Sequence, residues 1–411
     1  MNSFRRSVSL PLLLVVLFVF SSLWSASEGK VAAPQAAERG ESHSSRSSGN
    51  QSPALFSVEE KGKYGFIDSA GKMVISPKYS STQPFSEGLA AVTVGRKTGY
   101  IDETGTVVIP PKYSWTFRFS EGLSRVSLGK KWGYIDKTGQ MIIQPQYSGA
   151  DDFSDGLAAV QIRGKWGYID KNGHMVIPAE RRRPFPFHEG VAAVMTGDKW
   201  GLMDRDGRVI VPPQYDREIA FSAGLAAVRI YGKSGFIDQS GQMVIPPQYD
   251  DAAPFSEGLA AIRIDSKWGF IDRTGQVVIP PHFEWALDDD LSLSAIEPRF
   301  SEGLAAVEIN GKWGFLDKSG LMVIATQYDH AANFSEGLAA VQINGKWGFI
   351  NKFGQMVIQP QFAAPFYFFG GLARVWVGEK WGYIDLSGKY AWGPVPKKAC
   401  RLCWLDMIGY L

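Results

Sequence analysis

A period of 34 residues runs through most of this chain and constrains its fold more than any other feature. The segment Lys131–Asp136 reads Lys-Trp-Gly-Tyr-Ile-Asp, and its glycine returns in steps of 34 residues, with one step of 45 that carries 11 extra residues between Pro281 and Phe300. Its ten copies are Gly65, Gly99, Gly133, Gly167, Gly201, Gly235, Gly269, Gly314, Gly348 and Gly382. Such self-similarity indicates stacked copies of one structural unit.

Each unit contains three short apolar segments that predict β-strands. In one unit they are Leu157–Ile162, Lys165–Ile169 and Met175–Ile177. The turn Asp170–Gly173 joins the last two, because an Asp side chain can accept a backbone N–H two residues on and Gly tolerates positive φ. Proline pairs such as Pro246-Pro247 then end the third strand or hold it at a sheet edge, since proline cannot donate to a ladder.

The repeats predict an all-β tandem array from about residue 55 to residue 393. Both faces of the strands are apolar, so each unit needs cover on two sides, which its neighbours would supply. Ten units exceed the four to eight blades of an ordinary propeller. We therefore expect an open superhelical or solenoid-like array. The alternatives are a closed propeller-like ring and two sub-arrays divided at the insertion near 284–298.

The two ends of the chain differ from the array. Residues 1–27 combine Arg5 and Arg6 with an apolar run and small residues, as in a secretory signal peptide; an uncleaved anchor is the alternative. Residues 28–54 are Ser-rich and predict a disordered linker. The tail 394–411 holds Cys400 and Cys403, which lack the second ligand pair of a metal site and fit a local disulfide or free thiols. We expect a secreted, periplasmic or cell-surface protein.

The composition gives no sign of a catalytic or nucleic-acid-binding site. The net charge is only +2, without the basic excess that nucleic acid attracts. The five histidines occupy unrelated repeat positions, and Asp204 and Asp206 are too few oxygen ligands for calcium. No Ser/His/Asp set, phosphate loop or zinc spacing is present. We expect no enzyme activity, no cofactor, no metal, no nucleic-acid partner and no membrane span after signal removal.

The recurring motifs resemble those of the WG-repeat family, also called KWG repeats. The resemblance rests on Lys-Trp-Gly-[Tyr/Phe]-Ile-Asp, the Asp-x-x-Gly turn and Phe-Ser-Glu-Gly-Leu-Ala, and it covers roughly residues 55–393, over four fifths of the chain. It implies a β-repeat protein of bacterial type, without a general activity or catalytic residues to transfer. The Trp position departs from the pattern at Tyr64, Thr98 and Ser234.

Three sets of residues are candidates for ligand binding. A recurring aromatic ladder would suit sugar rings or extended peptides if it faced solvent, whereas burial would make it core; its members are Trp132, Trp166, Trp200, Trp268, Trp313, Trp347 and Trp381. A basic spot comprises Arg181, Arg182 and Arg183, which replace the usual Pro-Gln-Tyr, and an acidic loop comprises Asp288, Asp289 and Asp290. Solvated surface loops would look the same.

These observations favour a non-catalytic scaffold that binds a protein at the cell envelope. The alternative is a carbohydrate- or cell-wall-binding module that uses the repeated Trp and Tyr, and an enzyme with an unrecognised site ranks third. The first two hypotheses differ in whether the Trp side chains lie exposed in a row.

Overall fold

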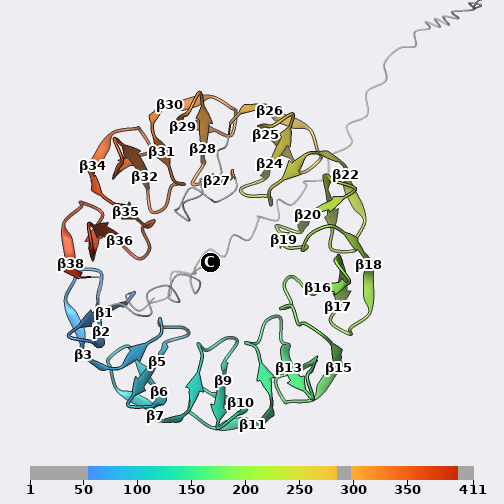
Figure 1. The fold of residues 1–411 in the computed structure, drawn as a ribbon, viewed down its shortest axis with the longest axis vertical. Helices are drawn as coiled ribbons and strands as arrows, with labels where there is room; N and C mark the ends of the chain where they lie inside the picture. Colours follow the sequence, from blue (N-terminus) through green and yellow to red (C-terminus); the bar gives the residue numbers. More distant parts are fainter. Residues whose placement is uncertain (1–53, 285–297, 397–411) are drawn as a thin grey trace, which may run out of the picture. The chain divides into compact units, whose positions relative to one another are not determined.

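The computed structural model describes residues 54–284 and 298–396 of the 411-residue chain. They form ten small antiparallel sheets, arranged as blades around a closed ring (Figure 1). These ranges contain no helix, and therefore none that could cross a membrane. The signal segment, all but the last residue of the Ser-rich linker, the Asp288–Asp290 loop and both cysteines lie outside the described residues.

Consecutive strands build each blade, and we number the blades 1 to 10 in chain order. Blades 1 to 3 comprise β1 (Phe56–Glu60), β2 (Lys63–Ile67) and β3 (Met73–Tyr79); β4 (Ser81–Thr82), β5 (Leu89–Val94), β6 (Lys97–Asp102) and β7 (Val107–Tyr113); and β8 (Trp115–Thr116), β9 (Leu123–Leu128), β10 (Lys131–Asp136) and β11 (Met141–Tyr147). Blades 4 and 5 comprise β12 (Gly149–Ala150), β13 (Ala158–Ile162), β14 (Lys165–Ile169) and β15 (Met175–Arg181); and β16 (Val191–Thr196), β17 (Lys199–Asp204) and β18 (Val209–Tyr215).

The second half of the ring follows the same plan. Blades 6 and 7 comprise β19 (Phe221–Ser222), β20 (Leu225–Ile230), β21 (Lys233–Asp238) and β22 (Met243–Tyr249); and β23 (Asp251–Ala252), β24 (Leu259–Ile264), β25 (Lys267–Asp272) and β26 (Val277–Phe283). Blades 8 to 10 comprise β27 (Phe300–Ser301), β28 (Leu304–Ile309), β29 (Lys312–Asp317) and β30 (Met322–Tyr328); β31 (His330–Ala331), β32 (Leu338–Ile343), β33 (Lys346–Asn351) and β34 (Met356–Phe362); and β35 (Ala364–Pro365), β36 (Leu372–Val377), β37 (Lys380–Asp385) and β38 (Tyr390–Pro396).

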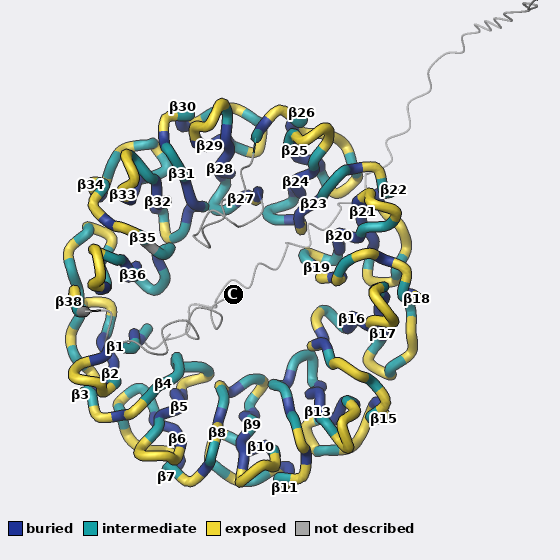
Figure 2. Tube along the Cα trace, in the orientation of Figure 1, coloured by how far each residue is buried: buried dark blue, intermediate teal, exposed yellow. Residues whose placement is uncertain are grey.

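Each blade therefore has the three predicted long strands, and eight of the ten described sheets add a two-residue strand on the inner side. The inner strands are largely buried and the last strand of each blade forms the exposed rim of the ring (Figure 2). That last strand is longer than predicted, because it continues through its prolines instead of ending there. In β11 a bulge between Ile143 and Tyr147 contains Pro145, and the strand lies at the sheet edge, where a missing N–H is tolerated.

The Asp-x-x-Gly turn has the predicted structure. In the turn after β6, Oδ1 of Asp102 accepts the backbone N–H groups of Thr104 and Thr106, and Gly105 has φ +84°. The other nine turns repeat this pair of bonds, with Asn351 in place of Asp in blade 9. The recurring Asp is thus a turn residue.

The hydrophobic core lies between blades rather than within them. The cluster between blades 3 and 4 joins Tyr134 and Ile143 to Phe153, Val160 and Ile169. Equivalent clusters fill all the other interfaces between neighbouring blades. Neighbouring units therefore shield each other's apolar faces, as the two-sided patterning predicts.

The ring closes where blade 10 meets blade 1. The rings of Phe56 and Tyr383 lie 5.4 Å apart, and the Tyr383 hydroxyl donates to the Ser57 carbonyl at 3.4 Å. The all-β tandem-repeat prediction is confirmed, but the arrangement is the closed ring and not the open array that the sequence favoured. In blade 2 the small residues Ala90 and Ala91 lie on the first long strand, and the larger Tyr100 and Tyr113 lie on the strands farther out; all four are buried.

Candidate functional site: a basic arc on one face of the ring

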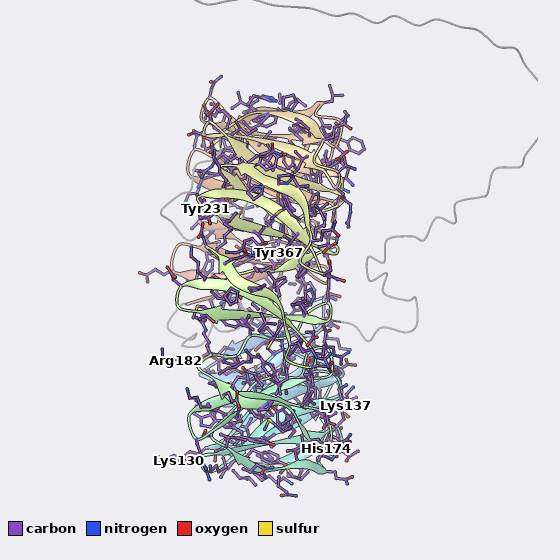
Figure 3. The ribbon with its side chains drawn as sticks, turned by 90° about the vertical axis from the view of Figure 1, so that its right-hand side faces the viewer. Lys130, Lys137, His174, Arg182, Tyr231 and Tyr367 are labelled. Carbon is purple, nitrogen blue, oxygen red and sulfur yellow. The ribbon has the colours of Figure 1, made fainter. Side chains whose placement is uncertain are left out.

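The connections between strands divide the ring into two faces. The hairpins between the first and second long strands lie on one face, which carries Lys130 and Tyr231; the corners after the last strand lie there too, as Arg182 shows (Figure 3). The Asp-x-x-Gly turns lie on the opposite face, together with Lys137 and His174 (Figure 3). We call these surfaces the hairpin face and the turn face.

On the turn face the recurring polar residues connect neighbouring blades. The Glu87 carboxylate of blade 2 accepts the backbone N–H of Gly122 at 3.1 Å and pairs with the Lys137 ammonium at 2.9 Å, both in blade 3. Glu121 makes the same two contacts with Gly156 and Lys171 one blade further on. The Glu of Phe-Ser-Glu-Gly is therefore used in assembling the ring.

The proposed aromatic ladder is largely part of the core. Four of its members, Trp268, Trp313, Trp347 and Trp381, are at most 8% exposed. The first three pack between blades, and Trp381 packs against Trp392 within blade 10. Their buried rings cannot stack against a ligand, which corrects the ligand-facing assignment for these four. The remaining three are half-buried: Trp132, Trp166 and Trp200.

Thr98 and Ser234, which replace the Trp, either mark a partly exposed position or leave a space that neighbours fill. Both side chains are buried, and Ser234 is 0% exposed. Neighbouring side chains therefore fill the space that the indole leaves. A buried position with a varying residue fits packing better than recognition.

Every blade places a lysine at the start of its second long strand, on the hairpin face. The ten are Lys63, Lys97, Lys131, Lys165, Lys199, Lys233, Lys267, Lys312, Lys346 and Lys380. What differs from blade to blade is the residue opposite, which follows the Tyr or Phe near the end of the last strand. In blades 1 to 8 this position determines whether the lysine has a carboxylate beside it; Lys346 and Lys380 of blades 9 and 10 are exposed and form no ion pair with a described residue.

In blades 5 to 8 that opposite residue is a carboxylate, and it neutralises the lysine. Lys233 pairs with Asp250, Lys267 with Glu284 and Lys312 with Asp329, each at 2.6 Å, and Lys199 pairs with Asp216. The hydrogen bond from each ammonium holds the pKa of its carboxylate below the usual range. The bond to Asp216 raises the pKa of Lys199.

In blades 1 to 4 the opposite residues are Ser80, Ser114, Ser148 and Arg182, so the lysines have no acidic partner there. A second cation also stands in each of these hairpins. We define the basic arc as the ten exposed side chains Lys61, Lys63, Arg96, Lys97, Lys130, Lys131, Arg163, Lys165, Arg182 and Arg183. None of them forms an ion pair with another described residue; Glu60 is the one exposed carboxylate within these hairpins.

The basic spot singled out in the sequence is one end of this arc. Arg182 and Arg183 are exposed, and the Arg183 guanidinium lies 5.1 Å from the centre of the Phe185 ring. Arg181 instead pairs with Trp166 across the sheet, and its guanidinium donates to the Gly207 carbonyl at 3.3 Å. Two of the three arginines thus belong to the arc and the third is structural.

Exposed apolar side chains accompany the cations. Trp115 is 67% exposed and pairs with Ser127, beside the hairpin that carries Lys130 and Lys131. The last residues of the first long strands in blades 2, 3 and 4, namely Val94, Leu128 and Ile162, are 51%, 44% and 38% exposed. The basic arc therefore offers positive charge with apolar surface between the charges.

Sequence reasoning missed most of these residues, although a signal was present. Aligning the units in register shows Lys-Gly-Lys, Arg-Lys, Lys-Lys and Arg-Gly-Lys in the first four hairpins, against Asp-Lys in the fifth. The whole-chain net charge of +2 hides this contrast, because the acidic residues are placed elsewhere. Within the described ranges, no three His, Cys, Asp or Glu side chains group closely enough to hold a metal ion.

Comparison with solved structures returns proteins of low sequence identity. A eukaryotic initiation factor is 10% identical, with a TM-score of 0.48, over 84% of this chain and 97% of that one. PorZ, a surface component of the type-IX secretion system of Porphyromonas gingivalis, is 11% identical, with a TM-score of 0.25, over 82% of this chain and 59% of that one. No curated protein matches the chain.

The family comparison agrees with the repeat observed in the fold. The description "WG containing repeat" matches ten consecutive stretches: 64–97, 99–132, 132–166, 166–200, 200–233, 235–268, 268–290, 298–313, 313–347 and 347–381. The matches span most of the ring, and nine of the ten begin at the Trp position or one residue after it, whereas the match 298–313 ends there. The chain belongs to the WG-repeat family.

Proposed function

We propose that this protein is a non-catalytic binding scaffold of the cell envelope or exterior, and that the basic arc is its binding surface. The observation that carries the proposal is that some polar residues are engaged in structural contacts and others are not. The Asp of the Asp-x-x-Gly turns and the Ser and Glu of Phe-Ser-Glu-Gly are taken up by turns and blade contacts, whereas the cations of blades 1 to 4 are exposed and form no ion pair with a described residue. Uncompensated charge on one face suits an acidic partner.

The site contains no arrangement of groups that favours catalysis. Asp102 and its counterparts hold turns, and Glu87 and its counterparts hold neighbouring blades together. In a repeat protein, a catalytic nucleophile, acid or base is expected at a position where one unit differs from all the others. The repeated lysines at the start of the second long strands can instead attract an acidic partner electrostatically, without taking part in a chemical step.

Export is part of the proposal. Its support is the sequence of residues 1–27, with two arginines before an apolar run and small residues after it. N-terminal sequencing of the protein recovered from the exterior or periplasm of its host is expected to begin near residue 28. Recovery of the full-length chain from the cytoplasm alone would contradict export and leave the ring's binding properties to be tested separately.

Binding is tested with purified cell envelopes and the purified chain. The wild-type chain is expected to sediment with the envelopes at low salt and to be released as salt is raised, because exposed charges are screened. A variant with Lys97→Gln, Lys131→Gln and Lys165→Gln is expected to remain in the supernatant. The matched control, Lys233→Gln with Lys267→Gln and Lys312→Gln, alters the same position in blades where the charge is already neutralised.

The control variant is expected to sediment like the wild type. Equal sedimentation of all three proteins would show that the basic arc is not the binding surface. No sedimentation of the wild type under any salt condition would contradict the scaffold function itself.

A further inference from the structure

Resting on the function proposed above, we propose that the ligand of the basic arc is a linear polysaccharide carrying regularly spaced acidic groups. The cations recur at one topological position in four consecutive blades. Packed sheets stand about 10 Å apart, so the cations form steps along a curved line. A polymer with repeating charges meets such a line at several points, which a compact anion cannot do.

The curvature of the arc argues against double-stranded nucleic acid. A duplex has a persistence length of about 50 nm and bends only at a substantial energetic cost. The arc turns through four of the ten blades of a small ring, so a straight duplex would touch a short part of it. A glycan chain can rotate at each linkage and follow the line.

Single-stranded nucleic acid needs aromatic side chains on which successive bases stack. In the described part of blades 1 to 4, Trp115, at 67% exposure, is the one large aromatic side chain that is mostly open to solvent. The neighbouring exposed residues are aliphatic: Val94, Leu128 and Ile162. One exposed indole between cations suits a single sugar ring better than a run of bases.

An anionic membrane would meet the hairpin face as a plane. Four of the ten blades are unsuited to it, because the lysines of blades 5 to 8 are paired and Asp198 and Asp265 are exposed in the hairpins of blades 5 and 7. The basic arc is a band along another part of the ring. A band selects a chain-like ligand over a flat surface.

Trp115 gives the band a point of sugar recognition. Trp115 lies on β8 and pairs across the sheet with Ser127. Ser127 is buried and also lies opposite Trp132 on β10. The neighbouring hairpin supplies Lys130 and Lys131, so a sugar ring on the indole can carry an acidic group toward either ammonium. The apolar face of a sugar and its charge are then satisfied together.

The test compares polymers of matched backbone. Polygalacturonate and its fully methyl-esterified form share a sugar backbone, but the ester has no charged carboxylates, and polyphosphate carries charge without sugar rings. By titration calorimetry at low salt, the purified chain is expected to bind polygalacturonate and not the ester. The Lys97→Gln, Lys131→Gln, Lys165→Gln variant is expected to bind about tenfold or more weakly, and the Lys233→Gln, Lys267→Gln, Lys312→Gln control like the wild type.

Trp115→Ala separates sugar recognition from charge alone. It is expected to weaken polygalacturonate binding several-fold and to leave polyphosphate binding unchanged, with an unaltered circular dichroism spectrum as evidence of folding. Tighter binding of single-stranded DNA or of phosphatidylserine vesicles than of polygalacturonate would overturn the polysaccharide assignment, while leaving the basic arc as a binding surface. Equal binding of the arc variant and the wild type to every polymer would reject both proposals.

Discussion

The Ser120 hydroxyl donates a hydrogen bond of 2.7 Å to the carbonyl oxygen of Phe153, 33 residues further along the chain and one blade around the ring. The same bond recurs from Ser86 to Phe119 and from Ser154 to Phe187. It recurs again in four blades of the second half, from Ser222, Ser256, Ser301 and Ser335. The serine of Phe-Ser-Glu-Gly is therefore a connection between blades.

Ser120→Ala is expected to destabilise the ring by about 0.5–1.5 kcal/mol, because the Phe153 carbonyl loses a partly buried partner. Urea unfolding followed by tryptophan fluorescence measures the change in the free energy of unfolding. Ser148→Ala is the control, since that hydroxyl is exposed and bonds within its own corner to Gln161. Equal destabilisation by both variants would contradict a special role for the bond between blades.

The recurring glycine of Trp-Gly has a cause that lies in the neighbouring strand. A Cβ on Gly133 would lie under 3.0 Å from the carbonyl oxygen of Ile143 and from the nitrogen of Pro145, where the bulge of β11 presses against β10. Gly133→Ala is expected to cost at least about 1–3 kcal/mol, because backbone atoms must move. Gly129→Ala is the control, with open space around it and only left-handed strain.

The melting temperature measures both variants. We expect the larger loss for Gly133, although Gly129 is the one with positive φ. A smaller decrease in melting temperature for Gly133→Ala than for Gly129→Ala would show that the backbone of β11 can shift away from residue 133 at little energetic cost.

The sequence predicted the three long strands and the Asp-x-x-Gly turn because both are local. Alternating apolar residues and the Asp102 turn depend on neighbours a few residues away. Ring closure is not local, since it depends on a small rotation between blades that accumulates over ten copies. The contact between Phe56 and Tyr383 joins residues over three hundred positions apart, which no periodicity reports.

The candidate site was harder to predict than the fold. The Trp residues attracted attention because they recur, yet recurrence marked the core, as Trp313 shows at 1% exposure. The basic arc is instead defined by what differs between units, such as Ser148 where blade 6 has Asp250. That contrast indicates a charged surface only once the hairpins are known to lie on one face of the ring (Figure 3).

Acid is expected to destabilise the ring through its turns. The Thr104 hydroxyl lowers the pKa of Asp102, and hydroxyls likewise lower the pKa of Asp238, Asp272 and Asp317. A carboxyl whose pKa is lower in the folded state stabilises it above the ordinary value near 4, and this contribution is lost as pH falls through the folded-state pKa. Melting temperatures are therefore expected to fall below about pH 4.

The variant Asp102→Asn with Asp272→Asn tests that cause. Asn351 already holds a turn of the same form, accepting two N–H groups through its amide oxygen, so the variant is expected to fold. Its melting temperature is expected to decline less steeply in acid than that of the wild type. If the melting temperature of the variant declines in acid as steeply as that of the wild type, carboxylates other than those of the turns cause the loss of stability.

The junction between blades 10 and 1 lacks two contacts that most other junctions have. Unit ten has Phe369 and Gly370 at the two positions where most units have the Ser and the Glu that reach to the next blade. As at the other junctions, no sheet spans this one in the described residues, because β1–β3 and β35–β38 pair only among themselves. Side-chain packing of Phe56, Val58 and Ile67 with Leu372 holds it closed.

Phe56→Ala is expected to open this junction before the rest of the ring unfolds. Removing a buried Phe side chain costs about 3–5 kcal/mol, and here the loss falls on an interface that lacks the serine and glutamate bonds found at most other junctions. Hydrogen exchange followed by mass spectrometry is expected to speed up in β1, β2, β36 and β37 and to stay unchanged in β13, β14, β20 and β21. Val94→Ala, at an exposed hairpin residue, is the control and should change neither region. Uniform acceleration around the ring would mean that the ten blades unfold as one unit and that the junction is no weaker than its counterparts.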